Sequence, residues 1–263
     1  MYKNVEIIYE DKEVVVCRKL PGVPVHTPKL GQQDMVSLLR NYFAMKGEEN
    51  TQIFVVHRLD QPVEGIMVFA RNKQAAAYLS RQSRERRMDK CYLALVEGRF
   101  AEASGVLEDY LWQDKETNTS SVVAQGTPGA KYAMLRYQVE KAVKLEEADR
   151  RDMIAGVESE IDNKSQETGN SAGSQKQGGD RSLVRVWLET GRHHQIRVQM
   201  ACAGHPIVGD RKYNPGSVQG FMPVGLCAVK IAFVHPVSGR RMEFSVEPQG
   251  KLFQVVDGND KRI

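Results

Sequence analysis

The sequence predicts an α+β fold, in which a mixed, largely antiparallel sheet carries flanking helices. Short runs of β-branched and aromatic residues recur along the whole chain, as expected for many strands. Helical spacing of apolar residues is confined to a few segments. Because strands and helices do not alternate strictly, the order of elements does not fit a parallel α/β fold.

The first half of the chain is predicted to open with a hairpin and to contain two helices. Asp34 is placed to cap a helix that runs to about Met45, and Lys73–Arg87 forms an amphipathic helix with its arginines outward. The predicted strands of this half are Val5–Tyr9, Glu13–Arg18, Ile53–Val56, Ile66–Ala70 and Cys91–Glu97.

The second half adds four predicted strands and one helix, Arg192–Ala203, which Gly204 is placed to end. The strands are Leu135–Val143, Leu183–Glu189, Gly225–Val234 and Arg241–Val246. Between the first two of these, the stretch at about 145–181 is dominated by Ser, Gly, Gln and charged residues, which predicts a flexible insertion. We therefore expect a single domain over residues 1–256 and a frayed tail over 257–263.

Composition narrows the class of protein. The chain has 263 residues, of which 41% are hydrophobic, and no stretch approaches the roughly 18 apolar residues of a membrane span. Its charged start does not resemble a secretory signal, and its four cysteines lie singly in apolar segments. We expect buried thiols in a reducing compartment, and therefore a cytoplasmic protein without membrane association.

Several kinds of chemistry lack their sequence motifs. His193 and His194 are adjacent, so their side chains would diverge by about 100° on a helix, and no H-x-x-x-H pattern occurs. No Walker-type phosphate loop and no G-x-S-x-G elbow are present. We expect no metal, no ATP chemistry and no hydrolase triad.

Charge is unevenly distributed, although the net charge is only +4. The segment from Arg71 to Lys90 contains seven cations and two acidic residues, Glu85 and Asp89. This pattern fits a polyanionic substrate, and it equally fits a solvated helix face.

Asp60 interrupts two predicted strands, in the stretch FVVHRLDQPVEGIMVFAR. Taken alone it is typical of a turn residue, because its carboxylate can accept hydrogen bonds from nearby backbone amides. Arg197 lies early in a predicted helix, on one face with the two histidines. If that helix docks beside the loop, Arg197 can pair with Asp60 and favour its ionised form; otherwise Arg197 is a surface residue.

Four blocks of the chain together resemble the RluA-type pseudouridine synthases. The first is His57-Arg58-Leu59-Asp60 followed by the stretch from Gly65 to Asn72. The other three, in order along the chain, are 90–98 (KCYLALVEG), 190–198 (TGRHHQIRV) and 204–210 (GHPIVGD). The resemblance covers almost the whole chain apart from the insertion and the tail. It implies the pseudouridine synthase fold and the isomerisation of uridine to pseudouridine in structured ribosomal or transfer RNA, without a cofactor.

The resemblance also assigns roles to residues. Asp60 matches the catalytic aspartate, which acts on the sugar or on the base. Tyr92 matches the tyrosine that packs on the target base, and Arg197 the arginine that pairs with the aspartate. Further substrate contacts are expected from His57, Arg58 and Arg192, and weaker contacts to the RNA backbone from Arg71, Arg84, Arg87 and Lys90.

Departures from the family pattern leave alternatives open. Val63 and Glu64 stand where Thr-Ser is common, which adds a negative charge near the expected RNA site and suggests a different substrate choice or loop geometry. No RNA-binding domain of the S4 type is expected ahead of Tyr2–Asp11, and we expect a monomer. The competing hypothesis is a non-catalytic RNA-binding factor for ribosome assembly with the same fold.

Overall fold

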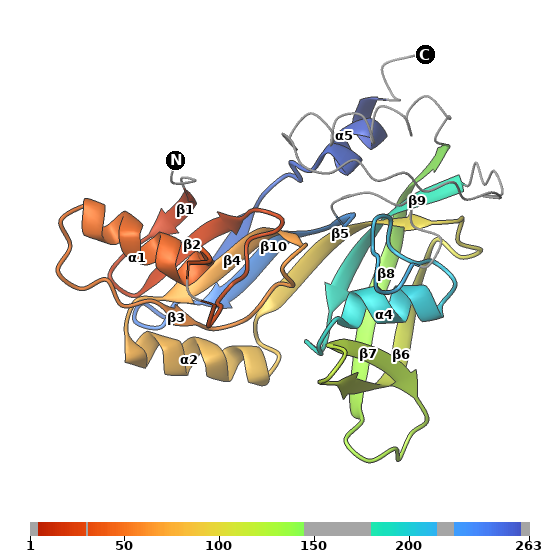
Figure 1. Ribbon diagram of the computed structural model, residues 1–263, viewed down its shortest axis with the longest axis horizontal. Coiled ribbons are helices and arrows are strands. Elements are labelled where there is room, and N and C mark those ends of the chain that lie inside the picture. Colours follow the sequence, from red (N-terminus) through yellow and green to blue (C-terminus); the bar gives the residue numbers. More distant parts are fainter. Residues whose placement is uncertain (1–4, 30, 145–179, 215–223, 259–263) are drawn as a thin grey trace.

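The computed structural model describes residues 5–29, 31–144, 180–214 and 224–258 (Figure 1). Its strands are β1 Glu6–Glu10, β2 Val14–Lys19, β3 Phe54–Val55, β4 Glu64–Ala70, β5 Asp89–Glu97, β6 Ser104–Asp114, β7 Thr119–Val123, β8 Lys131–Lys144, β9 Asp180–Leu188, β10 Leu226–Val234 and β11 Arg241–Ser245. Its helices are α1 Met35–Met45, α2 Lys73–Arg84, α4 Gln195–Cys202 and α5 Lys251–Gly258. None of these helices is long and apolar enough to cross a membrane.

Within the described ranges the strands form one sheet in the order β1-β2-β4-β10-β5-β9-β8-β6-β7, with β3 paired to β4 and β11 to β10. The pair β4–β10 is parallel, and the neighbouring pairs β2–β4 and β5–β10 are antiparallel. At this parallel seam a Cβ on Gly65 would lie 2.3 Å from the Ala228 carbonyl oxygen, so the close approach of the two backbones requires glycine. The predicted mixed α+β fold is confirmed.

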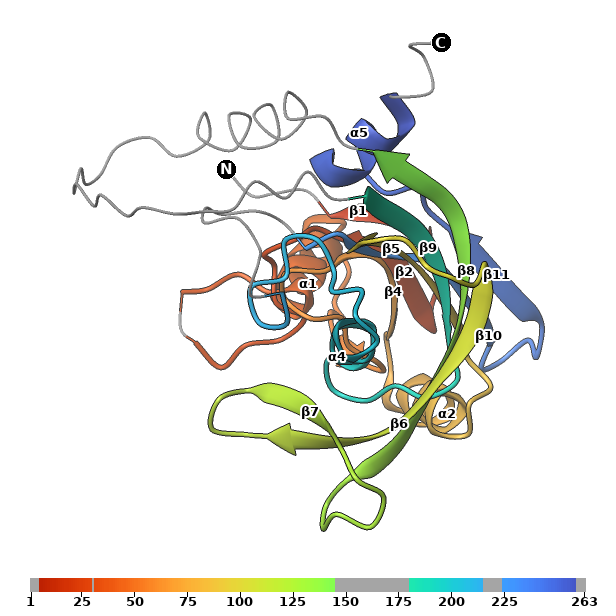
Figure 2. The same ribbon diagram turned by 90° about the vertical axis from the view of Figure 1, so that its right-hand side faces the viewer.

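The sheet curves, and its two halves carry different helices. Helix α2 packs on β3, β4 and β10, whereas α4 packs on β6 and β7. Figure 2 shows α4 on the concave side of the sheet, inside the curve that β9 and β8 describe. The curvature therefore brings the start of α4 toward the strands of the other half.

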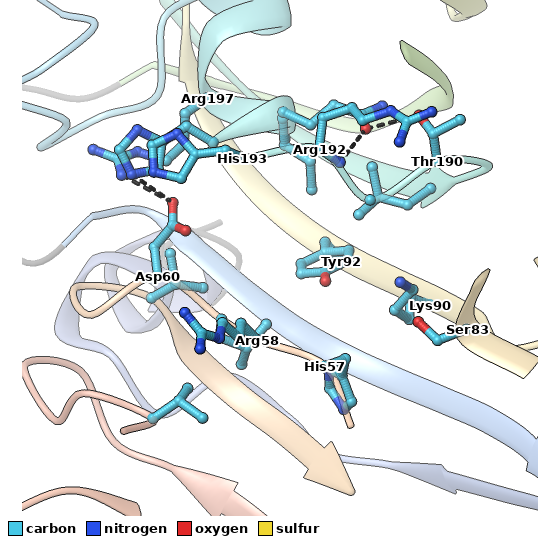
Figure 3. Close-up of a pocket in the computed structure, with 18 of the residues that line it drawn as sticks. His57, Arg58, Asp60, Ser83, Lys90, Tyr92, Thr190, Arg192, His193 and Arg197 are labelled. Carbon is cyan, nitrogen blue, oxygen red and sulfur yellow. Dashed lines mark hydrogen bonds and ion pairs between the residues drawn. The ribbon is translucent and has the colours of Figure 1, made fainter. Parts of the chain in front are cut away.

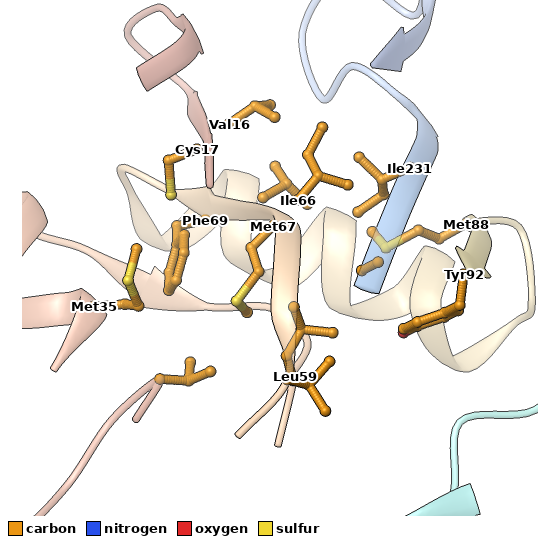
Figure 4. Packing of buried hydrophobic residues seen from close by; sticks show 14 of the residues in the cluster. Val16, Cys17, Met35, Leu59, Ile66, Met67, Phe69, Met88, Tyr92 and Ile231 are labelled. Atoms are coloured by element: carbon orange, nitrogen blue, oxygen red, sulfur yellow. The ribbon is translucent and has the colours of Figure 1, made fainter. Parts of the chain in front are cut away.

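The main hydrophobic core lies between β2, β4, α1 and α2. Strand β4 is buried along its whole length, as expected for a strand covered on both faces. Figure 4 shows Leu59, Met67 and Tyr92 within this same cluster. The core therefore extends to the loop that carries Asp60.

Several element boundaries differ from the predictions for backbone reasons. Helix α2 ends at Arg84, three residues early, because Arg86 adopts a left-handed conformation with φ 59°. Helix α4 begins at Gln195 because His194 does the same with φ 52°. Gly204, with φ 86°, follows α4 as predicted.

Other predictions were incomplete or wrong. Strands β6 and β7 and helix α5 were not predicted, and α5 extends over the first two residues of the tail expected to be frayed. Cys202 is exposed, not buried, because it lies at the solvent-facing end of α4. The proposed insertion lies almost entirely outside the described residues; the strands on either side of it, β8 and β9, pair directly.

Candidate active site

Asp60 lies in the loop between β3 and β4, and its position follows from its neighbours. Arg58 is exposed, Leu59 is buried in the core and Asp60 is partly exposed. The Val63 amide donates to the Asp60 carbonyl at 3.1 Å, which closes a turn at this point. Leu59 thus anchors the loop while the next residue carries its carboxylate toward the cavity.

Lys19, at the end of β2, supports this loop from inside. Its side chain is fully buried, and its ammonium donates to the carbonyls of Leu20, Gln61 and Val63 at 3.1, 2.9 and 2.6 Å. Burial lowers the pKa of Lys19 to about 7, against the opposing attraction of Asp60 and Glu64. Two of these carbonyls, Gln61 and Val63, belong to the loop, so the buried Lys19 side chain ties the loop to the end of β2.

Arg197, in the first turn of α4, joins two carboxylates. Its Nη1 donates to Asp60 Oδ2 at 2.9 Å, while Nε and Nη2 donate to the two oxygens of Asp210 at 2.7 Å each. Burial alone would lower the pKa of Arg197, but the hydrogen bonds and charges of Asp210 and Asp60 raise it overall. The predicted Asp60–Arg197 pair is therefore present in the structure. Asp210 holds the same guanidinium through two parallel hydrogen bonds and so fixes its orientation.

His194 lies beside the same carboxylate. Its Nε2 is 3.6 Å from Asp60 Oδ2, and its ring is stacked on that of His193 at 3.7 Å between centroids. Burial lowers the pKa of His194 to about 4, although Asp60 acts in the opposite direction. His194 is therefore a neutral ring at physiological pH.

A cavity of about 930 Å³ opens in front of Asp60, between the β3–β4 loop, the end of α2 and the start of α4. Figure 3 shows Tyr92 between Asp60 and Arg197 on one side and Lys90 and Ser83 on the other. Burial raises the pKa of the Tyr92 phenol, so it stays protonated at neutral pH. The cavity thus combines a carboxylate, a buried aromatic ring and several cations.

The cations predicted to contact RNA are only partly gathered here. Arg58, Arg84, Lys90 and Arg192 line the cavity together with His57. Two others do not line it. The guanidinium of Arg71 pairs with Glu48 and lies over the ring of Phe43, and Arg87 pairs with Glu85.

Lys90 and His57 have donors without partners. The Lys90 side chain has no hydrogen bond or ion pair to any residue that the structure describes, and burial lowers its pKa. The Val68 amide donates to His57 Nε2 at 3.2 Å, so the proton of the neutral ring is on Nδ1. This Nδ1 is buried and finds no acceptor among the described residues.

Of the two residues that depart from the family pattern, Val63 lines the cavity, whereas Glu64 does not. Glu64 is buried, and its carboxylate accepts from the backbone amides of Gly250 at 2.9 Å and Gln249 at 3.4 Å, just before α5. Its negative charge is therefore balanced at the start of a helix. The interpretation that this charge faces the RNA is not supported by the geometry.

Four residues at the site were not given roles from the sequence: Lys19, His194, Asp210 and Tyr213, whose hydroxyl lies 2.7 Å from His194 Nδ1. The sequence offered one signal for Lys19, which follows shortly after the apolar run Val14–Cys17. The structure buries all six residues of β2, Lys19 included. Asp210 ends the block 204–210, which served only to identify the family resemblance. Its contact with Arg197 depends on a turn in which the Asn214 amide donates to the Asp210 carbonyl at 2.8 Å.

Comparisons with known proteins place the chain in a family. The family model described as RNA pseudouridylate synthase matches residues 13–202. The uncharacterized RNA pseudouridine synthase YhcT of Bacillus subtilis is 28% identical, over 90% of this chain and 66% of its own length. The chain thus spans about two thirds of that relative.

Two further comparisons concern sequence and fold. The dual-specificity RNA pseudouridine synthase RluA of Vibrio vulnificus is 32% identical, over 89% of this chain and 79% of its own. The structure of human RNA pseudouridylate synthase domain containing 1 superimposes with a TM-score of 0.68 at 22% identity, over 94% of this chain and 85% of its own, which shows a common fold. From the family match and the relatives, the chain belongs to the RNA pseudouridylate synthase family, among its RluA-type members.

Proposed function

We propose that this protein converts uridine to pseudouridine in structured RNA, with Asp60 as the catalytic residue. The observation that carries the proposal is the Asp60 carboxylate, held at 2.9 Å by Arg197 at the cavity that Tyr92 lines. A carboxylate aimed into a cationic cavity is not needed for binding a polyanion. Its presence supports catalysis over simple RNA binding.

The reaction needs no net gain or loss of atoms or electrons. The bond from N1 of uracil to C1′ of ribose breaks, the base turns, and a bond forms from C5 to the same carbon. The proton on C5 is released to solvent, and N1 takes up a proton. Asp60 acts on the sugar or on the base during bond exchange, while Tyr92 packs against the detached ring and keeps it in place.

The target nucleotide must leave its stack before it can reach Asp60, which costs a few kcal/mol. We assign Arg58 to this step, because its exposed side chain lies two residues before Asp60 and can fill the vacated space or contact phosphate. Arg84, Lys90, Arg192 and His57 supply further contacts from the cavity wall. Phosphate contacts of this kind attract RNA without regard to sequence.

The similarity to known RNA-modifying proteins supports RNA as the substrate class. The relative from Vibrio vulnificus is named a dual-specificity RNA pseudouridine synthase, which supports RNA as the substrate here. We extend this to a uridine in ribosomal or transfer RNA, modified in the cytoplasm by a monomeric enzyme. Light scattering of the purified protein tests the monomer, and pseudouridine mapping in cells with and without the gene identifies the site.

The direct test is tritium release from RNA that carries 5-tritiated uridine, prepared from cells lacking the gene. The wild-type protein should release tritium to water, and Asp60→Ala should abolish release while keeping its fold. Persistent release by Asp60→Ala would refute the role of Asp60. Binding without any release by the wild type would favour the non-catalytic RNA-binding factor instead.

A further inference from the structure

One side chain, Tyr213, contacts both residues that approach Asp60. Its hydroxyl lies 2.7 Å from His194 Nδ1, and its ring centroid lies 5.2 Å from the guanidinium carbon of Arg197. The rings of Tyr213 and His194 meet edge to face at 5.6 Å. Neither Tyr213 nor His194 has a role in the proposed reaction, so their arrangement needs another explanation.

The ring form of His194 depends on which partner donates in its hydrogen bond with Tyr213. The backbone amide of Ser120 can only donate, and it donates to the Tyr213 hydroxyl at 2.7 Å. The hydroxyl proton is then free to go to His194 Nδ1, its other polar neighbour. A Tyr213 hydroxyl that donates to Nδ1 leaves the proton of the neutral ring on Nε2, the atom 3.6 Å from Asp60 Oδ2.

The backbone around His194 holds this orientation. His194 has φ 52°, a left-handed conformation that is uncommon for a residue with a Cβ and that often marks functional sites. His193 stacks on it, with Nδ1 2.9 Å from Ser120 Oγ, and Ser120 Oγ donates to the His193 carbonyl at 2.9 Å. Ser120, in β7, thus contacts both Tyr213 and His193.

We propose that His194 and Tyr213 are positioning residues for Asp60: the Tyr213 hydroxyl fixes the ring form of His194 whose Nε2–H faces the carboxylate, and the Tyr213 ring supports Arg197. The proposal rests on the function proposed for Asp60. The separation of 3.6 Å is longer than a hydrogen bond. Catalytic hydrogen bonds that are long in a free enzyme often shorten in its substrate complex, and we place the Nε2–H contact in that class.

The first test is a double-mutant cycle measured by tritium release. Tyr213→Phe keeps the ring and removes the hydroxyl, so kcat should fall about three- to tenfold with KM for RNA nearly unchanged. Tyr137→Phe, on β8, is the matched control and should leave kcat unchanged. In a His194→Ala background, Tyr213→Phe should have almost no further effect, because the hydroxyl acts through that ring.

The second test reads the ring directly and does not depend on activity. In protein labelled with ¹⁵N-histidine, NMR should find His194 protonated on Nε2 in the wild type and a mixture of the two ring forms in Tyr213→Phe. Asp60→Asn should shift the Nε2–H resonance. A His194 protonated on Nδ1, or full additivity in the cycle, would overturn the proposal. If the wild type released no tritium, the proposed function would fail, while the NMR result would still decide the arrangement of His194.

Discussion

The two ends of the cavity treat polar groups in opposite ways. At the first end, which we name the paired end (Asp60, Arg197 and Asp210), both carboxylates contact the same guanidinium at 2.7 to 2.9 Å. At the second, the open end (His57 and Lys90), two donors have no acceptor among the described residues. Lys90 is half-buried, but His57 Nδ1 is fully buried, and a folded protein rarely leaves a buried donor unmet. The open end is therefore suited to an acceptor that arrives with the substrate.

The difference separates two tasks. The paired end is organised before any ligand arrives, which is the condition for electrostatic catalysis without rearrangement. Two further cations, Arg192 and Arg86, line the same cavity as the open end, and burial and the neighbouring Arg86 lower the pKa of Arg192. Because like charges repel, a phosphate between them would stabilise the cluster. We therefore expect substitutions at the paired end to affect stability and turnover, and those at the open end to affect RNA binding.

The largest effect should follow from breaking the paired end at Asp210. Asp210→Asn leaves Arg197, whose side chain is 5% exposed, without the full charge of its partner. Removal of one partner from a buried ion pair costs roughly 3–5 kcal/mol, and tritium release should fall at least about 100-fold. Urea unfolding and the tritium assay measure the two effects.

The matched control is the exposed pair of Lys230 and Glu243, whose side chains are 42% and 50% exposed. Glu243→Gln should change the free energy of unfolding by at most about 1 kcal/mol and leave turnover unchanged. Equal losses in the two variants would mean that burial does not distinguish the paired end from an ordinary surface contact.

Arg197→Ala should lower turnover about 100-fold and RNA affinity much less. The guanidinium is engaged by Asp60 and Asp210, so it has little capacity left for phosphate. Tritium release at saturating RNA, together with filter binding, separates the two quantities. If affinity alone fell, Arg197 would be a phosphate contact. The paired end would then serve RNA binding, as the open end is expected to do.

The paired end was partly predictable from sequence. The placement of Arg197 on one helix with the two histidines suggested its pairing with Asp60, and the pairing is present. The contact between Asp210 and Arg197 was not predictable, because it depends on a turn whose geometry no local sequence pattern specifies. The left-handed backbone of His194 also escaped prediction, because only glycine signals such a conformation reliably.

Other elements were missed for related reasons. Strand β6 is mostly exposed or half-exposed along its length, so it lacks the apolar run that identified the central strands. Arg71 appeared to belong to a basic surface, but its pairing with Glu48 joins residues 23 positions apart, which composition does not reveal. The fold class and the catalytic loop were thus predictable, whereas the partners of individual charges were not.

At the open end, acid should destabilise the protein through His57. Burial lowers the pKa of His57 to about 3 from its ordinary 6.5, so below pH 6.5 the unfolded chain takes up the proton first. The stability contributed by the neutral ring is present above pH 6.5 and is lost as the pH falls toward 3. At pH 5 the loss is about 2 kcal/mol, on the ordinary relation between pKa and free energy.

Urea unfolding of the wild type and of His57→Gln at pH 7 and pH 5 measures this loss. The variant lacks the titrating ring, so its decrease in stability between the two pH values should be smaller by about that amount. Equal decreases in the two proteins would show that the His57 ring takes up a proton as readily in the folded state as in the unfolded chain. Burial of His57 would then not lower its pKa.

The smallest effect is expected from Lys90→Gln, which removes the unpaired cation of the open end while retaining a polar side chain. RNA affinity should fall about tenfold at low salt, and the slope of log affinity against log salt should decrease by about one, as for the loss of one phosphate contact. Arg240→Gln, in the exposed turn between β10 and β11, is the control and should leave the slope unchanged.

Titrations with a hairpin RNA that the wild type modifies give both the affinity and the salt slope. A fall in turnover at saturating RNA with an unchanged salt slope would instead place Lys90 against the flipped base, and both ends of the cavity would then belong to the chemical step.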